Sequence, residues 1–384
     1  MPIRPQGALA QGFVSPGFEP VREAFELNFE RYGEVGACCA VRVDGEPVVD
    51  LWGGDAGDGR PWTRDTIGLA YSVTKGATAI LCCLLADRGE LDLDAPVAGY
   101  WPEFGSGGKA ATTVRMLLSH RAGLPALDGR LTFDEVLQYG TAARALAGQR
   151  PLWAPGTAFG YHALTYGWLL DEVVRRATGR TIQDLFAAEI AGPLGLDFFI
   201  GLPRREEHRV AALIGEPPEQ DPSSLLTRAM TANGVFRTPD AATWNDPRIR
   251  RASIPAANGI TNARSLARLY AALVVEPGRP PLLSGKTLIA AISERSAGRD
   301  LVTGLDSRFG TGFMLPTAGT PMLSGSSFGH EGVGGALGFA DLDQRVGFGY
   351  VQNSLRSDPT GGPDPRVAGL ISALRDSLGE RRTS

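Results

Sequence analysis

Lysine is scarce in this chain. Only three of its 384 residues are lysines (Lys75, Lys109 and Lys286), and arginine supplies the rest of its 38 basic residues. The 42 acidic residues leave a net charge of −4, which gives no electrostatic basis for binding nucleic acid or an anionic membrane. A lysine inside an apolar segment of such a chain therefore needs a specific explanation.

Long apolar runs are absent as well. No stretch of about 18 apolar residues occurs, so we expect no transmembrane helix. Residues 1–18 lack the apolar segment of a secretory signal. The four cysteines form two adjacent pairs, Cys38–Cys39 and Cys82–Cys83, whose spacing suits neither a zinc site nor an internal disulfide. We expect reduced, packed thiols in a cytoplasmic protein without a metal or another cofactor.

Strand-like segments lie at both ends of the chain and helical segments lie between them. A helix is predicted over 20–33, a hairpin over 36–54 with its turn at Asp44-Gly45, and a helix from Ser72 to about Arg88. Between 90 and about 240 the pattern is helical and interrupted by proline and glycine. Two further helices (263–274 and 284–296), several strands between 309 and 353 and a last helix (366–379) are predicted after it.

This order predicts an α+β fold. We expect an antiparallel sheet formed from both chain termini and flanked by helices, with an inserted, mostly helical lobe. The predicted division assigns 1–90 and 241–384 to an α/β domain with the sheet and 91–240 to the helical lobe. The active site is expected between the two parts.

The first candidate site is in AYSVTKGATAILCCLL, residues 70–85. A serine and a lysine three residues apart on a helix lie on the same face, so the amine of Lys75 can reach the hydroxyl of Ser72. A lysine that acts as a base must be neutral, and lowering its pKa from about 10.4 to about 7 requires roughly 4–5 kcal/mol. Burial beside an apolar helix start supplies part of this energy. The alternative is a lysine whose stem is buried and whose amine reaches water.

Two other segments of the chain match the spacing of a serine nucleophile motif. Ser106 and Lys109 have the same spacing but lie in a glycine-rich segment, so we expect Lys109 to be a solvated surface residue. GSSFG, residues 325–329, has the Gly-x-Ser-x-Gly spacing of a nucleophile elbow centred on Ser327. A strand-like, glycine-rich stretch follows it instead of a helix, so we interpret this match as a coincidence of composition.

Further segments occur in a characteristic order. Tyr161 precedes a long predicted helix, and His330-Glu331-Gly332 begins a late strand. Five segments carry the pattern: DTIGLAYSVTKGATA, ELDLDAPVAGYWPEF, TVRMLLSHRAGLP, PLWAPGTAFGYHALTYGWL and GHEGVGGALGFADL. In this order the chain resembles the serine β-lactamase/penicillin-binding-protein superfamily, and within it the family VIII carboxylesterases.

The resemblance implies a role for each matching residue. Ser72 is expected to be the acylated nucleophile, with Lys75 and Tyr161 sharing the work of the base, and a buried cation nearby is expected to lower the pKa of Tyr161. The backbone N–H groups of Ser72 and Val333 are expected to form the oxyanion hole. Residues expected to contact substrate are His330, which is alternatively purely structural, Gly332, and Tyr71 and Trp153 as walls of an apolar acyl pocket. His120 is expected to be structural.

Departures from the superfamily pattern favour an ester substrate. His330-Glu331-Gly332 stands where the lactamase branch has Lys-Thr-Gly, and Ala163 stands where that branch has asparagine. Both changes remove donors for an anionic, amide-bearing substrate. We therefore predict a serine carboxylesterase that hydrolyses uncharged, short-chain esters of small molecules. The alternatives are a β-lactamase or D-amino-acid peptidase, an acyltransferase, and a non-catalytic binding protein; the sequence indicates no oligomeric state.

Overall fold

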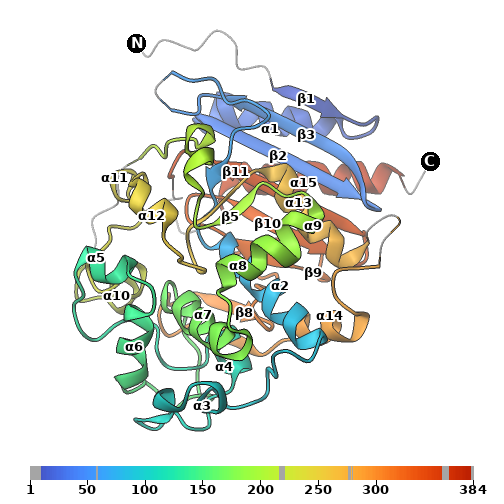
Figure 1. Cartoon of the computed structure of the whole chain (residues 1–384). Coiled ribbons are helices and arrows are strands. Elements are labelled where there is room, and N and C mark those ends of the chain that lie inside the picture. Colours follow the sequence, from blue (N-terminus) through green and yellow to red (C-terminus); the bar gives the residue numbers. More distant parts are fainter. Residues whose placement is uncertain are drawn as a thin grey trace.

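A six-stranded antiparallel sheet joins the two ends of the chain (Figure 1). The computed structural model describes residues 10–57, 59–215, 221–275, 278, 280–356 and 363–381. The strand order is β1-β3-β2-β11-β10-β9, and β2 pairs with β11. The strands are β1 (Gln11–Val14), β2 (Gly36–Val43), β3 (Glu46–Gly54), β9 (Ser327–Glu331), β10 (Leu337–Asp341) and β11 (Val346–Gln352). The predicted α+β fold with a sheet from both termini is confirmed.

The predicted hairpin at the start of the sheet is also confirmed. Strands β2 and β3 are joined at Asp44 and Gly45, which have φ angles of 54° and 82°. Positive φ at both positions is the requirement of a type I′ turn.

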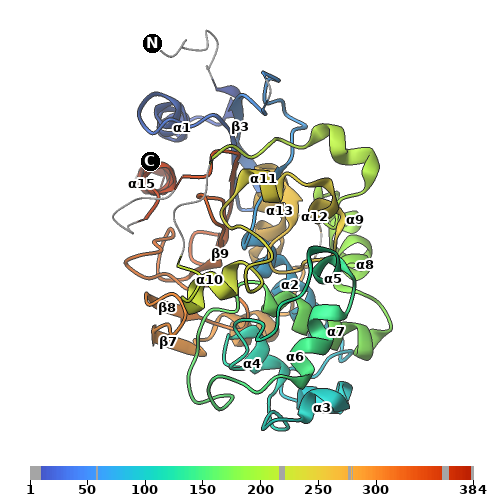
Figure 2. The same cartoon turned by 90° about the vertical axis from the view of Figure 1, so that its left-hand side faces the viewer.

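Helices cover both faces of this sheet. Helices α1 (Glu19–Arg31) and α15 (Pro365–Arg381) pack together on one face, and α13 (Ala263–Val274) and α2 (Val73–Asp87) lie on the other (Figures 1 and 2). Alternation along β11 explains the two faces. Gly347 and Gly349 face α13, where a Cβ on either glycine would collide with backbone carbonyls of the helix. Phe348 and Tyr350 point to the opposite face and pack in the core formed with α1 and α15.

Short helices fill most of the chain between 91 and 251. They are α3 (Val97–Tyr100), α4 (Val114–Leu118), α5 (Phe133–Leu137), α6 (Thr141–Gly148), α7 (Thr165–Thr178), α8 (Ile182–Phe186), α9 (Gly192–Leu194), α10 (Leu225–Met230), α11 (Ala241–Trp244) and α12 (Pro247–Arg251), with single 3₁₀ or π turns at Pro102–Gly105, Ala187–Ala191 and Arg204–Arg209. The predicted helix over 284–296 is too long, because α14 (Gly285–Ile292) ends earlier and the chain enters β7 (Ser296–Arg299), which pairs with β8 (Asp306–Phe309).

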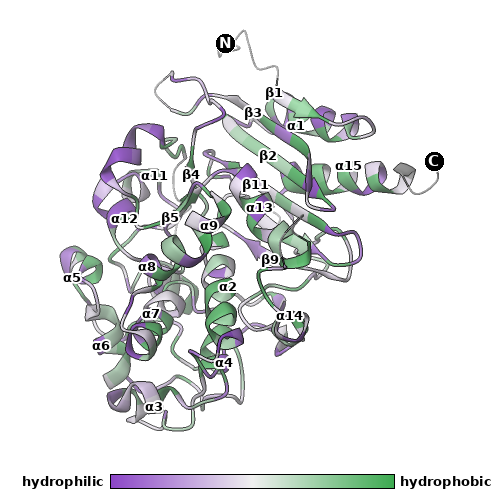
Figure 3. Cartoon of the chain, turned by 45° about the vertical axis from the view of Figure 1, so that its right-hand side comes forward, coloured by the Kyte–Doolittle hydropathy of each residue, from purple (hydrophilic) through white to green (hydrophobic). Residues whose placement is uncertain are grey.

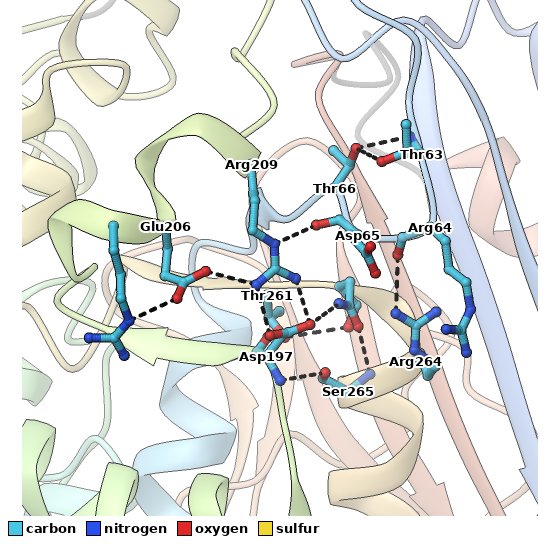
Figure 4. A network of polar contacts seen from close by, with 12 residues as sticks. Thr63, Arg64, Asp65, Thr66, Asp197, Glu206, Arg209, Thr261, Arg264 and Ser265 are labelled. Carbon is cyan, nitrogen blue, oxygen red and sulfur yellow. Dashed lines mark hydrogen bonds and ion pairs between the residues drawn. The ribbon is translucent and has the colours of Figure 1, made fainter.

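A three-stranded sheet connects the helical segment to the turn that carries Ser72. It contains β4 (Gly68–Leu69), β6 (Gly259–Thr261) and β5 (Phe198–Ile200) in the order β4-β6-β5. A polar network secures it (Figure 4): Asp197 accepts two bonds from Arg209, at 3.0 and 2.6 Å, and its N–H donates to Ser265 Oγ at the start of α13. This network holds the segment before α10 against the helix that supports the large sheet.

Helix α2 runs through the centre of the molecule and is mostly green in Figure 3. Every residue from Val73 to Leu85 is buried. All four cysteines are buried and free, and burial raises the pKa of each thiol. The helices that the structure describes include none with the length and apolar character needed to cross a membrane. The first nine residues of the segment examined for a signal lie outside the described residues.

Candidate active site

A tight turn presents Ser72 at the start of α2. Tyr71 has a φ of 45°, a left-handed conformation that is costly for a residue with a side chain. The turn is held by β6, because Ala70 N–H donates to Gly259 O at 2.9 Å and Gly259 N–H donates to Thr74 Oγ1 at 2.8 Å. Ser72 therefore occupies a fixed position and retains 8% exposure.

The amine of Lys75 has three polar neighbours and no exposure. Its Nζ lies 3.1 Å from Ser72 Oγ, 2.7 Å from Ala163 O and 2.9 Å from Ala256 O. Burial lowers the pKa of Lys75 well below its ordinary value. A neutral amine has two N–H groups and one lone pair. Because the two carbonyls can only accept hydrogen bonds, they take both N–H groups and the lone pair is left for the hydroxyl of Ser72.

Lys109, the other lysine with this spacing, is buried and not solvated, so that prediction was wrong. Its Nζ donates to three backbone carbonyls, Ser106 O at 3.0 Å, Ala147 O at 3.1 Å and Gln149 O. Three acceptors require three N–H groups, which only the ammonium form has. The sequence misled because glycine-rich segments are usually exposed, whereas this one folds back around the amine. Ser106 Oγ donates to Glu103 O and Ala147 O, so the serine–lysine hydrogen bond of the first copy is not repeated.

Tyr161 lies in an extended segment before α7, which begins only at Thr165. The centroid of its ring is 4.8 Å from Lys75 Nζ. Burial raises the pKa of Tyr161 above its ordinary value, and a side-chain hydrogen bond with Ser72 lowers it less. The expected lowering of this pKa is therefore wrong, because burial disfavours the charged phenolate more than the hydrogen bond with Ser72 favours it.

Two buried histidines hold the segment that carries Tyr161. His120 accepts the N–H of His162 at its Nδ1 (3.1 Å), and its backbone carbonyl accepts the N–H of Gly160 (3.1 Å). His162 accepts Leu124 N–H at Nε2 (3.0 Å), so its Nδ1 carries the proton and donates to Gly160 O (2.7 Å). Burial lowers the pKa of His162 to about 4 and that of His120 well below its ordinary value. Both rings are thus neutral, and these contacts agree with the structural role expected for His120.

The end of β9 closely approaches the turn that carries Ser72. A Cβ on Gly332 would collide with the carbonyl oxygen of Ala70, so the backbone of 332–333 lies beside the turn that carries Ser72. The ring of His330 is buried, with its centroid 6.1 Å from that of Tyr161. His330 Nδ1 lies 2.7 Å from Glu331 O and donates to it, which leaves Nε2 as an unprotonated acceptor. Burial lowers the pKa of His330 to about 3, so this ring is neutral.

The two aromatic residues expected in an acyl pocket have different surroundings. Trp153 is half-buried and packs with Tyr161 against a small apolar cluster of Ala126, Ala163, Ala229 and Val302. Tyr71 is 2% exposed, and its ring meets that of Trp244 edge to face at 5.0 Å. Trp153 Nε1 and the Tyr71 hydroxyl are buried and have no hydrogen-bond partner among the described residues. Contact of either residue with substrate stays a prediction.

Ser327, the central residue of the Gly-x-Ser-x-Gly match, is hydrogen-bonded between two strands of the large sheet. It is buried at the start of β9 and donates to Asp341 Oδ2 at 2.6 Å. A strand follows it where a nucleophile elbow would have a helix. The interpretation of this match as coincidental agrees with that geometry.

The comparisons with known proteins agree with this arrangement. The model of the beta-lactamase family matches residues 21–373. The chain belongs to the beta-lactamase family. This family member is 35% identical to "Esterase/beta-lactamase LipL" of Mycobacterium tuberculosis, over 97% of this chain and 89% of the relative.

Solved structures match this beta-lactamase family member over nearly its whole length. A family VIII carboxylesterase is 39% identical, with a TM-score of 0.87, over 96% of this chain and 99% of the other. EstA from Arthrobacter nitroguajacolicus Rue61a is 39% identical, with a TM-score of 0.88, over 97% of this chain and 99% of the other.

Two parts of this family member's site carried no signal in the sequence. Ala163 and Ala256 contribute only their carbonyl oxygens, which every residue has. Asp300 accepts the N–H of Tyr161 at 3.2 Å across 139 positions of sequence. No local sequence pattern relates Asp300 to that amide.

Proposed function

We propose that this chain is a serine carboxylesterase that forms an acyl-enzyme at Ser72. The observation that carries the proposal is the set of partners of Lys75, whose Nζ lies 2.7 and 2.9 Å from two carbonyl oxygens and 3.1 Å from Ser72 Oγ. When burial keeps the amine neutral, the two carbonyls take its N–H groups and its lone pair is left for the serine hydroxyl. An amine in this state accepts the serine proton as the hydroxyl attacks the ester carbonyl. The names of LipL and of the matched carboxylesterase support the same reaction class.

In this mechanism Tyr161 acts as a phenol. Because burial raises its pKa, the hydroxyl keeps its proton at neutral pH and relays protons between Lys75, Ser72 and the departing alcohol. A water then attacks the carbonyl carbon of the acyl-enzyme and gives a proton to Lys75 and Tyr161. As the bond to Ser72 Oγ breaks, these two groups return a proton to Oγ and the carboxylic acid is released. The backbone N–H groups of Ser72 and Val333 are proposed to stabilise the oxyanion, each contributing about 3 kcal/mol.

The proposed substrate is an uncharged, short-chain ester of a small molecule. A neutral His330 supplies no positive charge for a substrate carboxylate, and Ala163 belongs to an apolar cluster. His330, Gly332, Tyr71 and Trp153 are the proposed substrate contacts. The substrate would bind between the sheet domain (1–90 and 241–384) and the helical lobe (91–240), since each part contributes residues to the group around Ser72.

We further propose that the enzyme acts in the cytoplasm, without nucleic acid or membrane partners.

Hydrolysis of p-nitrophenyl acetate, butyrate and octanoate, compared with that of nitrocefin, tests the reaction class. We expect kcat/KM for an ester to exceed that for nitrocefin by at least about tenfold; strong nitrocefin turnover with negligible ester cleavage would favour the β-lactamase alternative.

Mass spectrometry after fluorophosphonate treatment should find a single adduct on the peptide containing Ser72. Ser72→Ala should lower kcat by at least about 10³, whereas Ser327→Ala should retain the wild-type rate.

A further inference from the structure

A buried carboxylate outside the Ser72–Lys75–Tyr161 group contacts the backbone of the proposed proton relay. Asp300 is 1% exposed and directly follows β7. In the part of the chain that the structure describes, it has no ion-pair partner and its Oδ2 has no hydrogen bond. A buried carboxylate of this kind costs free energy unless something compensates for it.

Three backbone amides provide that compensation. Asp300 Oδ1 accepts the N–H of Tyr161 at 3.2 Å and those of Val302 and Thr303 at 2.8 Å each. Two of these amides belong to the turn that connects β7 and β8, and the third belongs to the segment before α7. One oxygen atom therefore joins two parts of the chain that are far apart in sequence.

A second contact makes this connection reciprocal. Leu301 N–H donates to Phe159 O at 3.2 Å, so the turn and the 159–161 segment exchange hydrogen bonds in both directions. Within the turn, Asp300 N–H donates to Leu305 O at 2.9 Å and Gly304 N–H donates to Asp300 O at 3.0 Å. The turn is thus closed on itself, and Val302 is buried in the apolar cluster beside Trp153.

We propose that Asp300 is a positioning residue for Tyr161, holding its backbone so that the phenol stays within reach of Ser72 and Lys75. This inference rests on the proposed function, in which Tyr161 relays a proton. His120 holds the flanking residues Gly160 and His162, but no helix holds Tyr161 itself, and its own N–H is bonded to Asp300. Without this acceptor the backbone of Tyr161 is free to shift. A displacement of about 1 Å at a reacting group lowers a rate by about 10².

The test compares Asp300→Ala with Asp300→Asn, using p-nitrophenyl butyrate. We expect Asp300→Ala to lower kcat by about 10²-fold while KM changes less than about threefold. Asp300→Asn keeps an oxygen at Oδ1 for the three amides and should recover kcat to within about fivefold of wild type. If the alanine variant does not fold, Asp300→Ser, which is too short to span the same distance, replaces it and should show the same loss.

Asp341 provides the matched control. It is also buried and also organises a turn, accepting from Ser324, Ser327 and the N–H of Gln344, but it is bonded to no residue of the site. Asp341→Ala should lower the melting temperature about as much as Asp300→Ala and leave kcat within about threefold of wild type. If Asp300→Ala also keeps kcat within threefold, or if asparagine rescues nothing, the positioning role is wrong. A Ser72→Ala variant with full activity would instead overturn the proposed function itself.

Discussion

Gly332 lies against the carbonyl of Ala70, two residues before the proposed nucleophile, and no side chain fits between them. The carbonyl belongs to backbone that cannot easily retreat, because Ala70 N–H is bonded to Gly259 O on β6 at 2.9 Å. The close spacing between the end of β9 and the start of α2 therefore requires a residue without a Cβ at position 332.

Gly332→Ala should consequently impair the proposed oxyanion hole. The added methyl group must separate the 332–333 backbone from the Ser72 turn, and we expect kcat to fall by at least about 10². Steady-state hydrolysis of p-nitrophenyl butyrate measures this. Gly369→Ala is the control: a Cβ there meets no other atom within 4 Å, and it lies within α15. That variant should keep wild-type kcat and gain about 0.5–1 kcal/mol in free energy of unfolding. Wild-type kcat in Gly332→Ala would contradict the close-approach argument.

The two buried lysines should respond differently to the same substitution. Lys109→Met removes the amine donor from three backbone carbonyls, of which Ala147 O keeps the hydroxyl of Ser106, and this should reduce the free energy of unfolding by about 2 kcal/mol in urea denaturation. Its kcat per folded molecule, counted by fluorophosphonate labelling, should match wild type. Lys75→Met should lower kcat by at least about 10³ in the folded protein. Equal effects of both substitutions on kcat would mean that the distinction between ammonium and amine is wrong.

Buried neutral histidines predict a loss of stability in acid. The pKa of His162 is about 4 in the folded protein and about 6.5 when exposed, so only the unfolded chain binds this proton between those values. Stability from this group is complete above pH 6.5 and decreases as the pH falls towards 4. Between pH 7 and pH 5 the loss should be about 2 kcal/mol.

Urea unfolding at both pH values checks this contribution. In His162→Asn, which cannot bind the proton, the difference in free energy of unfolding between pH 7 and pH 5 should shrink by about 2 kcal/mol. The variant itself will be less stable at pH 7, because Leu124 N–H loses its acceptor. An unchanged difference between the two pH values would show that His162 is not held neutral.

Trp153 should influence the preference for acyl-chain length. It is half-buried beside the apolar cluster that includes Ala163, next to the carbonyl that binds Lys75. Trp153→Ala should change the ratio of kcat/KM for p-nitrophenyl octanoate and acetate by about tenfold, since one methylene group in a hydrophobic pocket is worth about 1–3 kcal/mol. Trp52→Ala is the control. The indole of Trp52 donates to Gln11 on the neighbouring edge strand, and Trp52 does not belong to the apolar cluster beside Trp153. An unchanged ratio in Trp153→Ala would place the acyl chain elsewhere.

Local patterns accounted for much of the fold. The Asp44-Gly45 turn, the extent of the 263–274 helix and the alternation of glycine with aromatic residues in β11 all follow from short stretches of sequence. The serine and lysine of α2 were identified from their spacing and from the apolar residues after them. Each of these features depends on neighbours within about one or two turns of chain.

The remaining features depend on contacts between distant segments. The ammonium of Lys109 is surrounded by carbonyls from 147 and 149, which no periodicity relates to a glycine-rich loop. The raised pKa of Tyr161 follows from how completely the site is enclosed. Neither enclosure nor carbonyl direction can be read from residue types, which explains why both expectations failed.

The two carbonyls that hold Lys75 come from positions 88 and 181 residues further along the chain. The amine is kept neutral only while both segments are closed around it. If either segment opens, water reaches the nitrogen, the proton returns and the lone pair that faces Ser72 is lost. In the proposed mechanism a locally opened molecule therefore leaves the hydroxyl of Ser72 without its base, and the proposed chemistry requires the fully assembled fold.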